Sequence, residues 1–206
     1  MARLLYIEAS PAKSTSHSID VAKVFVQTYQ QMNLQDELRS IDIWAADLPP
    51  FDAETIDAKF AVLRKKEFTP EQRARWDAVQ RISQRFNVAD KYIFSVPMWN
   101  FGVPYRLKHY IDVVTLAGEN WSWSRAEGYK SLLLRKKALL VYASAGDYGV
   151  SDPSDFQKPY LRRWLNFIGV TDIQEINVAP TLADAEAIAR TKCKAKVTAV
   201  QLAATF

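Results

Sequence analysis

The 206-residue sequence contains only one cysteine and two histidines. The lone Cys193 cannot form an internal disulfide, and two histidines are too few for a histidine-built metal centre. We therefore expect no metal site and a reducing, cytoplasmic setting. Long apolar runs are missing as well: the longest, at residues 138–145, is far below the roughly 20 residues that span a bilayer. No membrane association is expected.

Several sequence signatures are also missing. The first ten residues, MARLLYIEAS, have a short apolar run that Glu8 interrupts, so we expect no signal peptide. Neither G-x-G-x-x-G nor G-x-x-x-x-G-K-[ST] occurs, which argues against a Rossmann dinucleotide domain and a Walker NTPase. No G-x-S-x-G elbow is present, so a serine hydrolase is unsupported.

The charge is mildly basic, with 27 Lys and Arg against 23 Asp and Glu, a net charge of +4. This balance suits acidic small ligands such as phosphates. The basic residues form no stripe interleaved with aromatic residues, so a nucleic acid is not an expected partner. With 49% hydrophobic residues and no linker, residues 1–206 are predicted to form a single domain.

Short apolar runs alternate with helical patterns along the chain. Strands are predicted at 3–9, 37–44, 91–96, 137–143 and 171–178, and helices at 18–32, in two stretches between 52 and 86, and at 105–116, 160–168 and 183–203. Thr69, Pro70 and Gln72 suit a helix start, and Gly118 suits a helix end. Residues 119–131 are expected to be irregular and aromatic.

This alternation predicts an α/β fold, a doubly wound five-stranded parallel sheet with helices on both faces. Ligands of such sheets bind beyond the carboxyl ends of the strands, at the switch point in strand order. The loops after the first, third and fourth strands are therefore expected to carry the function. Asp152 and Asp155 are interpreted as ordinary loop polarity.

The first of these loops, residues 10–18, has hydroxyls on five of its nine residues and leads into a helix. Hydroxyls and free N–H groups at a helix N-terminus can bind a phosphate dianion. Alternatively, Ser16 or Ser18 merely caps the helix. The residues alone leave both interpretations open.

The other two loops contain aromatic and small residues. Residues 97–104 place Trp99, Asn100, Phe101 and Gly102 between two prolines, which suits a flat ring with a polar edge or a packed hydrophobic turn. Residues 144–149 include two glycines, a weak signal by itself. Together, a phosphate cradle and a ring site describe a flavin mononucleotide pocket like that of flavodoxin.

The chain resembles the FMN-dependent NADH-azoreductases, a flavodoxin-like family of NAD(P)H:quinone and azo reductases. The resemblance is sharpest at Ser10 with Ser16–Ser18, at residues 97–101 with 103–104, and at Ser144 with Gly146. Residues 107–112 and 160–172 support it. The chain departs from the family where Ala145 and Asp147 replace a usual Arg and Gly, and where Trp99 and Trp121 replace a common Tyr and Phe.

The resemblance implies a flavoenzyme oxidoreductase. It would pass two electrons by a ping-pong mechanism from NADH or NADPH, through tightly but non-covalently bound FMN, to quinones, azo compounds and, more widely, nitro aromatics. The implied FMN-binding residues are Ser10, Ser16, His17, Ser18, Met98, Trp99, Asn100, Phe101, Ser144, Ala145, Gly146 and Asp147, with Trp121 at the substrate. No residue is named as a catalytic acid or base.

The resemblance also implies a homodimer with its active sites at the subunit interface. Trp121 and Trp123 could instead simply pack at an interface. The main alternative function is a flavodoxin-type electron carrier without its own turnover of small molecules. Such carriers are usually acidic, whereas this chain has a net charge of +4.

Overall fold

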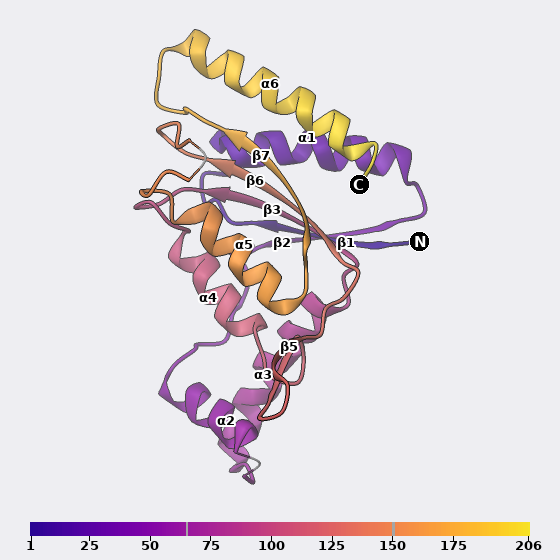
Figure 1. Cartoon of the computed structure of the whole chain (residues 1–206), viewed down its shortest axis with the longest axis vertical. Coiled ribbons are helices and arrows are strands. Elements are labelled where there is room, and N and C mark those ends of the chain that lie inside the picture. The colour runs from indigo at the N-terminus through magenta and orange to yellow at the C-terminus, as the bar shows by residue number, and fades with distance from the viewer. Residues whose placement is uncertain (65, 150) are drawn as a thin grey trace.

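The computed structural model describes residues 1–64, 66–149 and 151–206, and a five-stranded sheet lies at its centre (Figure 1). The strand order is β2-β1-β3-β6-β7, and all neighbouring strands are parallel. The strands are β1 (Arg3–Glu8), β2 (Glu37–Asp42), β3 (Lys91–Pro97), β6 (Lys137–Ala143) and β7 (Asp172–Val178). This order is that of flavodoxin, and the predicted fold class is confirmed.

The central strands are apolar throughout because both faces of the sheet are covered. Along β3, Tyr92 and Phe94 point to one core and Ile93 points to the other. Successive side chains of a strand alternate between faces, so a strand with two covered faces needs apolar residues at every position.

Helices form a layer on each face of the sheet. The helices are α1 (His17–Met32), α2 (Ala53–Leu63), α3 (Pro70–Asn87), α4 (Tyr105–Val114), α5 (Gln157–Ile168) and α6 (Ala185–Ala203). In Figure 1, α1 and α6 cover one face, α4 and α5 cover the other with α3 beyond them, and α2 packs on α3 away from the sheet.

Polar side chains set the helix ends. Thr69 and Gln72 form the predicted capping box at the start of α3. The helix α4 ends at Val114, earlier than predicted, because the buried Asn120 side chain donates to the Val114 carbonyl at 2.6 Å. Gly118 is therefore not its stop. The helix α5 begins three residues early because the carboxylate of Asp155 caps its first N–H groups.

The expectation of irregular structure at 119–131 was wrong. There β4 (Trp121–Ser124) and β5 (Gly128–Ser131) form an antiparallel hairpin with Trp123 opposite Tyr129. Gly128 has a φ of 68°, which helps the turn return into β5. Across the described ranges, none of the helices combines the length and apolar character needed to cross a membrane.

Candidate active site

Three loops meet at the carboxyl edge of the sheet. They follow β1, β3 and β6, which lie side by side with Glu8 opposite Ser95 and Pro97 opposite Ala143. Neighbouring strands are about 4.8 Å apart, so the structure brings residues 10–18, 98–101 and 144–147 together. Backbone bonds continue into the loops: the Met98 N–H donates to the Ala143 carbonyl at 2.7 Å.

The first loop leads into the N-terminus of α1. Ser16 is the N-cap, and its Oγ accepts a hydrogen bond from the N–H of Ile19 at 3.3 Å and lies 3.2 Å from Oγ of Ser18. Helix geometry leaves the first N–H groups, those of His17 and Ser18, without intrahelical acceptors. Ser10 and Ser18 are buried beside them. The loop therefore caps α1 through Ser16 and still leaves the N–H groups of His17 and Ser18 available to a ligand.

His17 has a buried polar atom that nothing in the described residues satisfies. Its Nδ1 is inaccessible to solvent and has no hydrogen-bond partner there. Burial lowers the pKa of His17, the charge of Lys192 lowers it further, and Asp20 opposes them. A buried donor or acceptor without a partner is costly, so this side chain is suited to bind an added polar group.

Cations from α6 surround the same helix start. Lys192 and Lys196 reach Asp20 on α1 at 2.6 and 2.9 Å. They add positive potential to that of the helix N-terminus, which favours an anion. Sequence reasoning missed Lys192, because only the packing of α6 on α1 brings it near residue 17.

Lys13, within the first loop, is bound elsewhere. Its Nζ lies 2.5 Å from a carboxylate oxygen of Asp42 and 3.8 Å from one of Glu8. Burial alone would raise the pKa of Asp42, but hydrogen bonds from Lys13 and the N–H of Trp44 bring it below its ordinary value. Lys13 thus ties the loop to the end of β2.

The second loop is a tight turn that exposes two aromatic rings. Trp99 and Gly102 exchange backbone hydrogen bonds at 3.0 and 2.9 Å, while Asn100 and Phe101 have φ values of 46° and 67°. Two positive φ values define a type I′ turn. Asn100 tolerates this conformation, whereas at Phe101 it costs about 1–2 kcal/mol. Trp99 is 36% exposed and Phe101 50%. Strain together with exposed rings is typical of a binding site rather than a packed turn.

Trp44, which sequence reasoning did not single out, supports this turn. Its indole N–H donates to the Ala9 carbonyl at 3.0 Å, and its ring lies 5.5 Å from that of Trp99. It therefore links the first loop to the second. Its position just after β2 gave no sign of this role.

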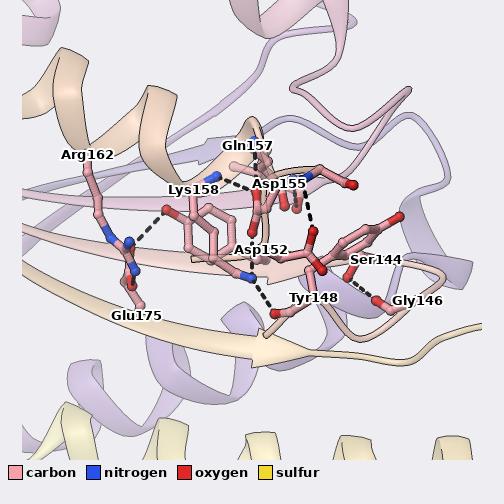
Figure 2. A network of polar contacts seen from close by, with 12 residues as sticks. Ser144, Gly146, Tyr148, Asp152, Asp155, Gln157, Lys158, Arg162 and Glu175 are labelled. Carbon is pink, nitrogen blue, oxygen red and sulfur yellow. Dashed lines mark hydrogen bonds and ion pairs between the residues drawn. The ribbon is translucent and has the colours of Figure 1, made fainter. Parts of the chain in front are cut away.

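The third loop is held by the segment after β7. The Thr181 N–H donates to the Ser144 carbonyl at 2.9 Å. Oγ of Ser144 donates to the Gly146 carbonyl at 2.8 Å (Figure 2). Residues 145–147 are exposed. Tyr148, also missed in the sequence, packs edge-on against Phe101 at 6.4 Å and so joins the third loop to the second.

Trp121 lies apart from these loops. Its ring packs on Tyr129 and Phe167 at 5.7 and 5.5 Å, at the carboxyl end of α5. The other end of α5 adjoins the second loop, where the Phe156 N–H donates to the Phe101 carbonyl at 3.0 Å. At 1.5 Å per residue these ends are roughly 16 Å apart. The structure does not bring Trp121 to the other predicted site residues of its own chain.

The sequence matches a family described as having a flavodoxin-like fold over residues 2–200. The chain belongs to this flavodoxin-like family. An FMN-dependent NADH:quinone oxidoreductase of Desulfotalea psychrophila is 38% identical over 205 residues, 98% of this chain and 97% of the relative. The enzyme of the same name from Nitratidesulfovibrio vulgaris is 40% identical over 195 residues, 93% of each chain. This flavodoxin-like chain is thus a member of the FMN-dependent NADH:quinone oxidoreductases.

Solved structures agree with the flavodoxin-like assignment. An FMN-dependent NADH-azoreductase from Bacillus anthracis str. Ames Ancestor, in complex with FMN, aligns with a TM-score of 0.86 at 26% identity, covering 98% of this chain and all of that one. An azoreductase from Bacillus anthracis str. Sterne aligns over both full chains with a TM-score of 0.90 at 23% identity, which supports the fold.

Proposed function

We propose that this chain is an FMN-dependent NAD(P)H oxidoreductase that reduces quinones and azo aromatic compounds. One observation carries the proposal. The loop 10–18, which suits an anion, and the exposed aromatic turn at 98–101 follow the neighbouring strands β1 and β3 and so lie side by side. Relatives at 38–40% identity that are named for FMN, NADH and quinone support it.

The residues present fit FMN. Nδ1 of His17 has no partner among the described residues. Together with Ser10 and the first N–H groups of α1, it would hold the phosphate. The turn at 98–101 and the exposed residues of the loop 144–147 would flank the ring, and their backbone groups would bind its polar edge. When bound, FMN supplies the hydride and electron chemistry.

The protein's task is then to orient the reactants and exclude water. Trp99 and Phe101 offer flat apolar surface against which a nicotinamide and an aromatic acceptor can stack. We expect both to use this place in turn, which makes the kinetics ping-pong without an obligatory acid or base. Asp147 adds a carboxylate at this loop, which disfavours anionic acceptors.

We infer that the enzyme acts as a homodimer in the cytoplasm. Exposed apolar side chains cluster on two surfaces, the aromatic turn with the helix starts beside it and the outer face of α2: Trp99, Phe101, Tyr105, Phe156, Ile56, Phe60 and Leu63. Such patches mark protein interfaces. A partner would also bring its Trp121 to this chain's flavin. The exposed free thiol of Cys193 suits a reducing compartment.

A visible absorption spectrum of the purified protein tests the proposal. We expect two flavin bands that anaerobic NADH or NADPH bleaches and that a quinone restores. Flavin bands that neither nucleotide bleaches would favour an electron carrier instead. A colourless protein that does not take up added FMN would refute the proposal.

A further inference from the structure

The first turn of α5 is built around a buried ion pair. The side chains of Asp155 and Lys158 are only 5% and 12% exposed, and Nζ of Lys158 lies 2.7 Å from Oδ2 of Asp155 (Figure 2). The other carboxylate oxygen, Oδ1, accepts hydrogen bonds from the N–H groups of Gln157 and Lys158 at 2.9 and 3.0 Å. The interpretation of Asp155 as ordinary loop polarity was wrong, because its carboxylate is buried and bonded on both oxygens.

Three consecutive residues of this turn each hold a segment of the candidate flavin site. The Phe156 N–H donates to the carbonyl of Phe101 in the aromatic turn at 3.0 Å. Nε2 of Gln157 donates to the carbonyl of Val96 at the end of β3 at 3.2 Å. Nζ of Lys158 donates to the carbonyl of Tyr148 at 3.4 Å, the only one of these bonds to the loop after β6.

The nearest cation on α5, Arg162, feels the charge of Asp155 but is hydrogen-bonded elsewhere. Arg162, one turn further along α5, binds Glu175 on β7 with Nε at 2.7 Å, and the Tyr142 hydroxyl donates to the same carboxylate at 3.1 Å. A cleft of about 360 Å³ is lined by residues of both networks, among them Lys158, Arg162 and Glu175. Because Arg162 binds Glu175, it does not take Asp155 from Lys158, whose ammonium donates to Asp155 and to the Tyr148 carbonyl.

A buried ion pair is a poor source of net stability, because removing two charges from water offsets their attraction. What the ion pair can provide instead is a fixed position for the two side chains that form it. The paired strands β3 and β6 and the bonds of Thr181 to Ser144 fix the start of the loop 144–149. Further along, at Tyr148, the loop is joined to the aromatic turn by the ring packing of Tyr148 on Phe101 and to α5 by Lys158. A shift of the loop relative to the turn would change the width of the slot between them.

We propose that Lys158, held by Asp155, is a positioning residue for the flavin ring. By holding the Tyr148 carbonyl, its ammonium fixes the loop 144–149 at the spacing from the aromatic turn that a flavin requires. Lys158 acts through this loop and not by touching the cofactor. This inference rests on the proposed function.

The main test is the double variant Lys158→Met/Asp155→Asn. It removes both charges, and the new asparagine oxygen still caps α5, so the apoprotein should keep its melting temperature. We expect FMN to bind roughly tenfold more weakly, as for the loss of one hydrogen bond from a charged donor. We also expect a more negative flavin midpoint potential, since a loosened loop presents its N–H groups less well to the reduced ring.

Two single variants test whether FMN binding depends on the charge and reach of the side chain at position 158. Lys158→Gln is too short to bridge Asp155 and the Tyr148 carbonyl and should weaken FMN binding as well. Lys158→Arg keeps the charge and the reach to both partners and should bind FMN more tightly than Lys158→Gln. The matched control is Arg190→Met, which breaks an exposed ion pair with Glu186 on α6 and should change nothing.

The outcomes distinguish this inference from the proposed function. If the parent protein does not bind FMN, the proposed function fails. If the parent binds FMN and NADH reduces it, but the double variant and Lys158→Gln match its affinity and potential, only the inference fails. A lower melting temperature of the apoprotein with unchanged FMN affinity also overturns it, since Lys158 would then be merely structural.

Discussion

The hydroxyl of Ser16 shows how one side chain can serve two purposes at a helix start. It accepts a hydrogen bond from the N–H of Ile19, which is typical of an N-cap. The N–H groups of His17 and Ser18 therefore stay available for another acceptor. Capping and anion binding are therefore not alternatives here. The side chain of His17 stands beside these donors with its own buried nitrogen unsatisfied within the described residues.

The titration of His17 should appear in the pH dependence of FMN binding. Burial and Lys192 hold the pKa of the free His17 below its ordinary value, so the ring is neutral near pH 7. A bound phosphate would raise that pKa, so binding takes up a proton, and FMN affinity should increase as pH falls through the pKa of His17 in the complex towards its lowered pKa in the free protein. Flavin fluorescence titrations would measure this dependence.

The control for this pH effect is His17→Asn. FMN's own phosphate titrates in both proteins, so only the difference between their pH profiles reports on His17. We expect that difference to shrink towards alkaline pH. Parallel profiles at all pH values would show that His17 does not contact the phosphate.

At the scale of elements, most functional geometry comes from where strands and helices end. The acidic cap at Asp155 starts α5 where it can reach two loops, and Gly169 ends it. Gly169 has a φ of 108°, and a Cβ there would lie 2.7 Å from the carbonyl oxygen of Leu133. This close approach packs the end of α5 against the segment that follows the hairpin.

Gly169→Ala should therefore destabilise the protein by at least about 2 kcal/mol, from backbone strain and the clash together. The control is Gly118→Ala, which shares a positive φ of 83° but has nothing within 4 Å of its added Cβ. It should cost only about 1 kcal/mol. Urea unfolding would measure both, and equal losses would mean that the contact with Leu133 does not matter.

Another prediction at this scale concerns Asp36, which lies between the N-terminus and α1. Hydrogen bonds from the Tyr29 hydroxyl and the Ala2 N–H lower the pKa of Asp36, burial opposes them, and the charge of Lys91 adds to them. Lys91 also donates to Tyr29 and to the Phe206 carbonyl at 2.8 and 2.7 Å. Asp36 thus binds the N-terminal residues to α1, and Lys91 binds the C-terminal Phe206 to Tyr29 on the same helix.

Because the folded pKa of Asp36 is depressed, its stabilisation is present above the unfolded pKa and is lost as pH falls through the folded one. Asp36→Asn should lower the free energy of unfolding at pH 7, and its difference from the parent should shrink below about pH 4. Denaturant melts across this range would test it. Glu186→Gln, at a side chain that is 83% exposed, should show no such trend.

At the scale of the whole molecule, the strand order determines where the three loops meet. The path of the chain between β3 and β6 places Trp121 away from them. The hairpin of β4 and β5 places Trp121 against Phe167 at the carboxyl end of α5, whereas the aromatic turn binds the other end of this helix through Phe156. A substrate slot that uses Trp121 therefore needs a second copy of the chain.

A complementation experiment tests this arrangement. If the chain forms the proposed homodimer, Trp121→Ala should keep it and bind FMN but reduce quinones with a lower kcat/KM. A Ser16→Ala/His17→Asn chain should bind FMN poorly. In a mixed dimer of the two, the retained flavin faces the intact Trp121 of the other chain, so the mixture should be more active than either homodimer. No gain on mixing would mean that Trp121 does not serve a partner's site.

The sequence by itself determined the sheet, its two covered faces and the three loops at its carboxyl edge, because apolar periodicity and helix caps are local signals. Tertiary structure decided the rest. Residues 121–124 form a strand only because they pair with 128–131. Lys192 comes near His17 only through the packing of α6 on α1. Asp155 becomes a buried ion-pair partner only once α5 covers the sheet. Burial and charge contacts depend on residues far apart in the chain, so no local pattern contains them.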